Sequence, residues 1–509
     1  MASKIGSDLR QRRVKSVFLL GIAGLCATYP EIVAAQAALA LPTGGEVRSG
    51  AATISQPTNG TVVVTQSSAT AILSWDGFSI GAGGGVRFDN GTGATLNRVT
   101  GNASSQIDGS LTASGSVFLI NPHGVVIGKD GVVNVGGSFI ASTLDVEDAA
   151  FTRRHDATFT GASRAAVLNM GKISALGGDV ALMAMETGNT GSISAPNGTV
   201  ALAAGSSVLM RDHALDEGRF AVLVGGPGSS ASNTGALAAA AVELRAAGGS
   251  VYALAGNTAG LIRATTVTKQ GGRVFLTAGD GGQVRVSDTT LSADGEHGGS
   301  ILLSGADVSV ESGGKLDVSG SASAGRIAAL ATGAMHFAGT ALARGGSGDG
   351  GLVETSGATL DLEGIAVDTG GARTGLWLVD PANLTVDARA ASSISRNLRT
   401  TNVALQTTAT GSSGPGTPTA GEGDITIAAP IAWSSPNRLT LDAYRAIRVD
   451  ADITVGDAGK LSLNAATDPS GVLLSFGTTD AIRFTGAPGG GRALTINGQA
   501  YQLLSLIHI

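Results

Sequence analysis

Short apolar runs alternate with glycine-containing turns along most of the chain. Residues 117–120, 125–127 and 132–135 form three such runs, rich in branched side chains. Runs this short, bounded by Gly, Pro, Asn or Asp, are typical of β-strands rather than helices. The turn at 121–124 combines proline, which fixes φ, with Asn and Gly, which adopt turn conformations readily, and the turn at 128–131 begins and ends with Gly. The pattern predicts short strands with a corner after each, as in a coiled β-solenoid.

Beyond residue 165 a motif of glycine followed by Val or Ile recurs at roughly the spacing of one solenoid coil. Val180 and Val200 are 20 residues apart, and Val251 and Val274 are 23 residues apart. Periods in the twenties match a parallel β-helix, and the consensus of leucine-rich repeats is missing. We therefore predict an all-β protein, a right-handed parallel β-helix, with β-helix repeats over residues 166–370.

The segments before and after these repeats have different sequence patterns from the repeats themselves. Residues 47–64 carry an alternating pattern rich in Thr and Val, with Asn59-Gly60 as a hairpin signal, which predicts an N-terminal β cap over the exposed end of the solenoid. Residues 371–503 return to β alternation after a stretch at 388–423 that is rich in Ser, Thr, Gly and Pro. That stretch is predicted to be an irregular linker.

The first 37 residues have the features of a signal peptide. A basic segment precedes an apolar run at 17–26, and Ala35-Gln36-Ala37 matches an A-x-A cleavage site. A membrane anchor is the weaker interpretation, because the run is far shorter than the ~20 residues that a span needs. Cys26 lies inside this segment, so the mature chain is expected to contain no cysteine.

The last six residues, 504–509, end the chain without a turn, cap or polar tail. Their letters, LSLIHI, match the translation of a common sequencing adapter. We expect them to be a sequencing artefact at the edge of a truncated chain, with a genuine apolar C-terminus as the alternative.

The amino-acid composition and net charge of the chain favour a β-solenoid and argue against one class of partner. The chain has 78 glycines, 4% aromatic and 14% charged residues, which suits narrow β-coils better than several globular cores. The net charge of -6 argues against nucleic-acid binding, which requires a basic face. We therefore expect no nucleic-acid partner.

Candidate chemistry is sparse. Enzymes with a β-helix fold align acidic residues on neighbouring coils for acid–base catalysis, and the chain has no Asp-Asp pair. The densest polar cluster, 211–217, and the charged stretch 147–156 are predicted to be solvated loops between coils. The 6 histidines show no metal-binding spacing. We predict that the protein is not an enzyme and has no catalytic residue, cofactor or metal site.

The turn Asn121-Pro122-His123-Gly124 lies within a longer resemblance. It follows a Val-Phe-Leu-Ile strand and precedes a Val-Asn-Val-Gly-Gly strand around Asn134 and an Ala-Ser-Thr segment at 141–143. Segments 75–81 and 96–101 match as well. Together they resemble the N-terminal secretion domain (haemagglutination activity domain) of filamentous haemagglutinin-type exoproteins, the exported partners in two-partner secretion. His123 departs from the family pattern, which has Asn there. We assign the secretion domain to residues 38–165.

The resemblance implies how the protein leaves the cell. It would cross the periplasm and then a dedicated outer-membrane β-barrel transporter of a Gram-negative bacterium, whose periplasmic domains would recognise the Asn121–Gly124 turn. The Asn121 amide is also expected to form a side-chain ladder with Asn134. Outside, the product would be secreted or held at the cell surface as an adhesin or haemagglutinin that binds host or bacterial surface glycans or receptors. A haemolysin or contact-dependent toxin, a glycan-active enzyme and a self-transporting passenger remain alternatives.

Overall fold

The computed structural model describes residues 40–503 except 216–217, 255–260, 265–270, 382, 408–421, 470, 478–481 and 486–490. The predicted signal peptide, with Cys26 and the Ala35–Ala37 site, and the tail 504–509 lie outside the described residues. Within them, no helix has the length and apolarity required to cross a membrane.

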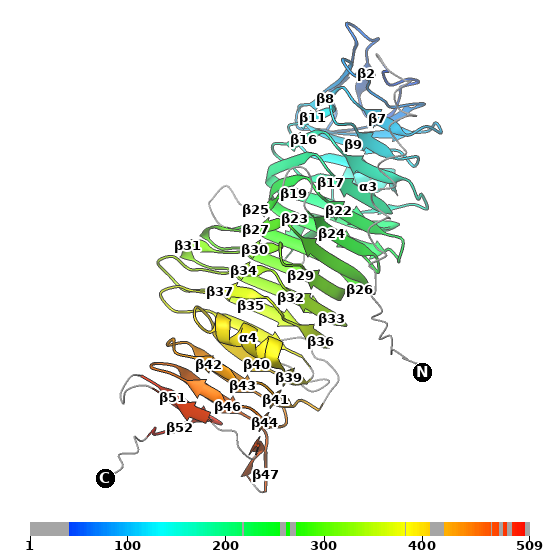
Figure 1. Ribbon diagram of the computed structural model, residues 1–509. Coiled ribbons are helices and arrows are strands. Elements are labelled where there is room, and N and C mark those ends of the chain that lie inside the picture. The colour runs from blue at the N-terminus through cyan, green and yellow to red at the C-terminus, as the bar shows by residue number, and fades with distance from the viewer. Residues whose placement is uncertain are drawn as a thin grey trace, which may run out of the picture.

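The chain forms a long rod of stacked β-coils (Figure 1). Strands from successive coils pair in parallel: β9 (Ser116–Ile120) pairs with β12 (Phe139–Ser142), and β12 pairs with β17 (Val180–Ala184). β17 pairs in turn with β19 (Ser192–Ala204), matching Val180 with Val200. The predicted parallel β-helix is confirmed, and the 20-residue repeat is one coil.

The core is a narrow column of apolar, mostly aliphatic side chains at the same register position in each coil. Side chains alternate in direction along a strand, so in-register parallel strands stack like with like. One such column is fully buried and runs almost the length of the rod: Val117, Phe139, Val180, Val200, Val242, Val274, Ile301, Ile327, Val353, Trp377, Val403, Leu439 and Leu461.

Stacked glycines form one of the corners between strands. A Cβ on Gly191 would lie 2.1 Å from the carbonyl oxygen of Gly171, and one on Gly235 would lie 2.1 Å from that of Gly191. Any side chain there would force the coils apart, because real Cβ atoms do not approach backbone so closely. Close stacking of coils therefore accounts for part of the high glycine content.

The N-terminal end is closed by antiparallel strands. β1 (Glu46–Ser49) pairs antiparallel with β4 (Thr70–Trp75), and β2 (Ala52–Ile54) pairs antiparallel with β3 (Thr61–Gln66). This is the predicted β cap.

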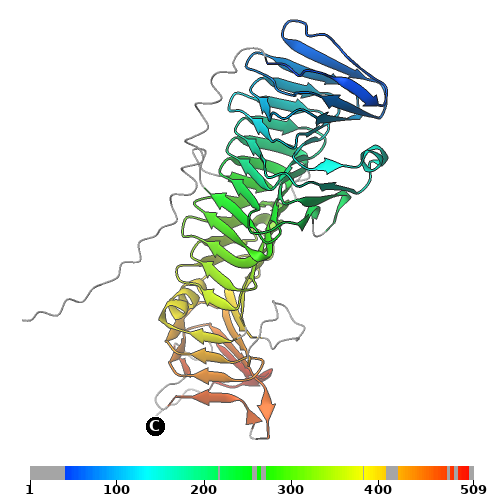
Figure 2. The same cartoon turned by 90° about the vertical axis from the view of Figure 1, so that its right-hand side faces the viewer.

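A separate four-stranded sheet projects from one side of the rod (Figure 2). It consists of β13 (Asp145–Val146), β14 (Ala157–Thr160), β20 (Ser207–Leu215) and β21 (Gly218–Val224), with helix α3 (Asp148–Arg153) beside it. The prediction of solvated loops is therefore wrong for 148–153, which form α3, and for 211–215, which belong to β20, while residues 216–217 lie outside the described residues. Apolar residues among the charges, Phe151, Phe159 and Phe220, are buried and pack this sheet against the coils.

The prediction of an irregular linker at 388–423 is also wrong for residues 388–406, which contain a helix and a strand. Residues 388–397 form helix α4 (Ala388–Asn397), and strand β40 (Asn402–Gln406) follows. Asp387 caps the helix by accepting hydrogen bonds from the backbone N–H of Arg389 and Ala390. Helix capping and the burial of Ile394 outweigh the loop-like composition. Residues 408–421 lie outside the described residues.

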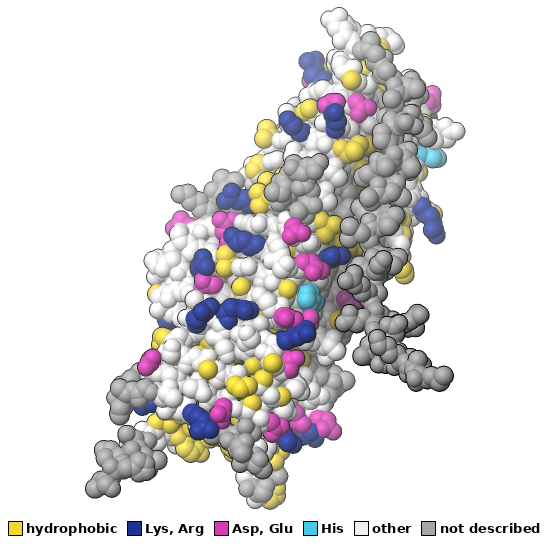
Figure 3. All heavy atoms as spheres, viewed as in Figure 1, with side chains coloured by type: hydrophobic (Ala, Val, Ile, Leu, Met, Phe, Trp, Pro, Cys, Tyr) yellow, Lys and Arg dark blue, Asp and Glu magenta, His cyan; other side chains and the backbone are white. Residues whose placement is uncertain are grey.

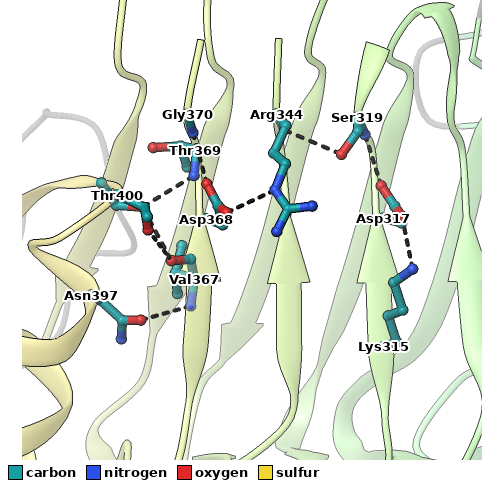
Figure 4. A network of polar contacts seen from close by, with 11 residues as sticks. Lys315, Asp317, Ser319, Arg344, Val367, Asp368, Thr369, Gly370, Asn397 and Thr400 are labelled. Atoms are coloured by element: carbon teal, nitrogen blue, oxygen red, sulfur yellow. Dashed lines mark hydrogen bonds and ion pairs between the residues drawn. The ribbon is translucent and has the colours of Figure 1, made fainter. Parts of the chain in front are cut away.

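Helix α4 also ends one ladder of the solenoid. Among the described residues, no strand follows β37 (Ala366–Asp368) in its ladder, and the side chain of Asn397 instead accepts a hydrogen bond from the backbone N–H of Val367 at 2.9 Å (Figure 4). The hydroxyl groups of Thr400 and Thr401 donate to the Val367 carbonyl. The strand edge is thus satisfied by side chains. Beyond it a new ladder starts with β42 (Ile431–Trp433) and β45 (Ile453–Val455).

Candidate secretion site

The Asn121–Gly124 turn joins β9 to β10 (Val125–Ile127) and is anchored by its first residue. Asn121 is fully buried, and its amide nitrogen donates to the Ala103 carbonyl at 2.9 Å and to Ser105 Oγ at 3.0 Å. Its amide oxygen accepts the backbone N–H of His123 at 2.9 Å. This is an Asx turn, and only an amide side chain supplies both the donors and the acceptor.

Gly124 closes the turn. Its φ is +104°, a conformation that L side chains rarely adopt, and a Cβ there would lie 3.1 Å from the Ala166 carbonyl oxygen. Its N–H donates to the Asn121 carbonyl at 3.0 Å, and its carbonyl accepts the N–H of Ser105 at 2.9 Å. Both ends of the turn are therefore fixed to the preceding coil.

The two middle residues face solvent. Pro122 and His123 are exposed, while Asn121 and Gly124 are buried. The carbonyl of Pro122 accepts a hydrogen bond from the hydroxyl of Ser163. The turn thus presents a proline ring and an imidazole in a fixed arrangement on the surface of the rod, which suits recognition by a partner without rearrangement.

Asn134 does not join Asn121. It lies in β11 (Val132–Val135) with its side chain exposed on the outer face, between the register neighbours Thr112 and Ser174. The predicted ladder between the two residues is wrong, because Val133 and Val135 take the inward positions of that strand and leave Asn134 pointing out.

An asparagine ladder exists elsewhere. The amide nitrogen of Asn169 donates to the amide oxygen of Asn189 at 2.7 Å, and Asn189 donates in the same way to Asn233 at 2.7 Å. All three are buried at the same corner of successive coils. The signal in the sequence that could have predicted this ladder is the repeat of residues 169–175 at 189–195, since each copy begins with asparagine.

The upstream segments of the resemblance are structural. Trp75 and Phe78 are buried with their rings 5.4 Å apart and nearly perpendicular, and Trp75 Nε1 donates to Asn97 Oδ1 at 3.0 Å. These residues build the first coils and do not reach the surface.

The projecting sheet is held to the coils by buried charges. Glu243 is 1% exposed, and its carboxylate accepts the backbone N–H groups of Arg219 at 2.6 Å and Phe220 at 3.0 Å and the Nε–H of Arg245 at 2.9 Å. Arg219 Nε lies 2.6 Å from the Asp179 carboxylate, which also accepts the N–H of Thr199 at 2.8 Å. These paired charges fix the position of β21 against the coils. The Glu243 carboxylate also accepts backbone N–H groups of β21 that the edge of the sheet would otherwise leave unpaired.

The described part of the chain contains no group of three or more His, Cys, Asp or Glu side chains arranged to hold a metal ion. Polar residues on the rod surface instead pair with one another: Arg344 Nε lies 2.7 Å from Asp368, and Lys315 Nζ lies 3.1 Å from Asp317 (Figure 4). On the face seen in Figure 3, basic and acidic side chains are interspersed.

A family model described as the TPS secretion domain matches residues 38–318, more than half of the 509 residues. The chain belongs to the two-partner secretion exoproteins. Membership implies secretion by way of the periplasm with an outer-membrane transporter as partner. The matched residues include the cap, the Asn121–Gly124 turn, the asparagine ladder and the projecting sheet.

Comparisons with individual proteins agree. The crystal structure of the HMW1 secretion domain from Haemophilus influenzae superposes with a TM-score of 0.51 and 28% identity, over 67% of this two-partner exoprotein and 100% of the HMW1 chain. Two sequences named heme/hemopexin-binding protein, also from H. influenzae, are 40% identical over 109 residues and 39% identical over 114 residues. Each alignment spans 21% of this chain and 12% of the relative.

Proposed function

We propose that this exoprotein is recognised in the periplasm by its transporter through the Asn121–Gly124 turn and then acts outside the cell as a non-enzymatic adhesin or haemagglutinin. Recognition by the transporter is supported by one observation: the first and last residues of the turn are buried, and its two middle residues are exposed. Asn121 and Gly124 are held by the preceding coil, while Pro122 and His123 are free to contact a partner.

The adhesin role is supported by the shape and surface of the chain. A rod of stacked coils presents a long outer surface, and such concave or flat solenoid faces are commonly used for binding. Host-cell or bacterial surface glycans and receptors are the proposed ligands. A haemolysin or contact-dependent toxin would carry its activity in a further domain, and it is the alternative within the same secretion class.

The names of these relatives do not by themselves assign haem or hemopexin binding to this chain. Only 12% of each relative aligns, so the alignment leaves most of those proteins unmatched. We therefore do not include haem or hemopexin in the proposed ligands.

Recognition through the turn is tested by changing its exposed tip. In Pro122→Ala/His123→Ala the buried anchors remain, so the fold is expected to be kept while export falls several-fold. The matched control is Lys129→Ala/Asp130→Ala, because these exposed residues occupy the next corner of the same coil. The measurement is the fraction of protein in the medium by immunoblot. Equal export of both variants would contradict the role of the turn.

The adhesin role is tested separately. Cells that export the protein are expected to adhere to epithelial cells or agglutinate erythrocytes more than cells that lack it, and purified protein is expected to compete. Normal export without any gain in adherence would leave secretion standing and would overturn the adhesin proposal.

A further inference from the structure

Three oxygen-bearing side chains are buried on the outer face of the rod where β35 (Leu352–Ser356) meets β38 (Leu376–Asp380). Glu354 is 3% exposed, and Ser356 and Asp380 are fully buried. Within the described part of the chain, the Ser356 hydroxyl and both carboxylate oxygens of Asp380 have no hydrogen-bond partner. Buried polar groups are almost always paired, so three unpartnered oxygens at one place require an explanation.

The strand register brings these side chains together. Ser356 lies directly beside Asp380, and Glu354 lies beside Leu378, in parallel pairing. The intervening residues Val353, Thr355, Trp377 and Val379 point into the core, so Glu354, Ser356 and Asp380 all point outward. Strands about 4.8 Å apart and a rise of about 3.3 Å per residue place the Cα atoms of Glu354 and Asp380 about 8 Å apart, within reach of their two side chains.

The charges at this position do not balance. Glu354 has a partner, since its Oε2 lies 2.5 Å from Arg326 Nη2. The carboxylate of Asp380 has no counter-ion of its own, and burial together with the neighbouring Glu354 raises its pKa to about 7. A buried carboxylate without a partner is costly, and the cost is removed either by a proton or by a cation.

We propose that Asp380, Ser356 and Glu354 form a binding site for a divalent cation of the calcium class. Asp380 would supply two oxygens, Ser356 its hydroxyl and Glu354 the oxygen that does not face Arg326. Hard cations of this size take six to eight oxygen ligands, and backbone carbonyls or water would complete the set. The all-oxygen donor set does not suit zinc or copper, which prefer nitrogen and sulfur.

The site lies at a structural junction, which indicates what the ion would do. After β38 the chain passes through β39 (Leu384–Val386) into α4. Beyond β38 only the ladder through β40 continues from the upstream coils, while separate ladders start with β39 and with β42. An ion that joins β35 to β38 would strengthen the connection between the two parts of the rod.

The test is thermal unfolding of the full chain at pH 8 in EGTA and in 2 mM CaCl₂. For the unmodified protein, calcium is expected to raise the midpoint by about 2 °C or more. Asp380→Asn is expected to abolish this shift, and Ser356→Ala to reduce it. Asp361→Asn is the matched control, because Asp361 is an exposed aspartate on the nearby strand β36 (Thr359–Asp361) and should keep the full shift.

A second readout reports the ion directly. Trp377 lies three residues before Asp380 on the same strand, so terbium bound at the site should emit when tryptophan is excited. Asp380→Asn should lose this emission, and Asp361→Asn should keep it. No calcium shift, or the same shift and emission in Asp380→Asn, would overturn the site. If the unmodified protein has the same midpoint in EGTA and in calcium while Asp380→Asn is more stable than it in both, only a proton neutralises the carboxyl and the cation site is overturned.

Discussion

The amide nitrogen of Asn121 lies 3.0 Å from the hydroxyl oxygen of Ser105, and both residues are fully buried. This hydrogen bond fixes the turn to the coil before it. It explains why an asparagine at the end of an apolar strand matters to the fold as well as to any partner, since its side chain satisfies backbone groups that the corner leaves unpaired.

Asn121→Ala is therefore expected to destabilise the protein by about 1–3 kcal/mol, because it removes the three hydrogen bonds of the amide. The Ala103 carbonyl and Ser105 hydroxyl lose their donor, and the backbone N–H of His123 loses its acceptor. Asn134→Ala is the control. Its side chain is exposed, so a change of within about 0.5 kcal/mol is expected. Urea unfolding followed by circular dichroism measures both, and equal losses would contradict the assignment of the anchor.

The middle of the asparagine ladder should be more sensitive than a surface asparagine. Asn189→Ala removes both 2.7 Å hydrogen bonds and leaves Asn169 and Asn233 partly unpaired in a buried corner, at an expected cost of about 2–3 kcal/mol. Asn197, which is exposed and donates to the Leu176 carbonyl, is the matched control. A loss in Asn197→Ala as large as that in Asn189→Ala would argue against the ladder.

Glu243 is expected to control the docking of the projecting sheet. Glu243→Ala leaves the backbone N–H groups of Arg219 and Phe220 and the side chain of Arg245 without their shared acceptor, which should cost about 3 kcal/mol. Hydrogen exchange should then rise across β20 and β21 and stay unchanged in β35. Glu186→Ala, a change at an exposed glutamate, should leave exchange in the sheet as it was.

The pH dependence of stability follows from Asp380. Its pKa of about 7 in the folded chain lies above the ordinary value of 3.8, so the folded state holds more protons than the unfolded state between these values. In EGTA, this residue should therefore make stability fall as pH rises from about 4 to 7, with no further change above pH 7. Asp380→Asn should remove that part of the slope. An unchanged slope in the variant would assign the dependence to other groups.

The sequence was sufficient to predict the repeating architecture. The spacing of glycine and branched residues set the coil length, and alternation along each run set which side chains enter the core, as the column from Val117 to Leu461 shows. These are local patterns with a fixed period, which is why they can be read without tertiary information.

What could not be predicted depended on distant partners. In the projecting sheet, β14 pairs with β20, which lies about 50 residues later in the sequence. The many charged residues in these segments suggested solvated loops, although the aromatic side chains between them pack the sheet against the solenoid. Helix α4 was missed because its composition resembles a loop, while its stability comes from the Asp387 cap and burial of Ile394. The orientation of Asn134 was missed because the two valines beside it decide which face it takes.

The most direct test of the account is export of the full chain from a Gram-negative host with and without an outer-membrane transporter of the two-partner type. We predict that the protein appears in the medium or on the cell surface only when the transporter is present, and that it remains in the periplasm otherwise. Equal amounts outside the cell in both strains would contradict the central claim that this chain is the exported member of a two-partner system.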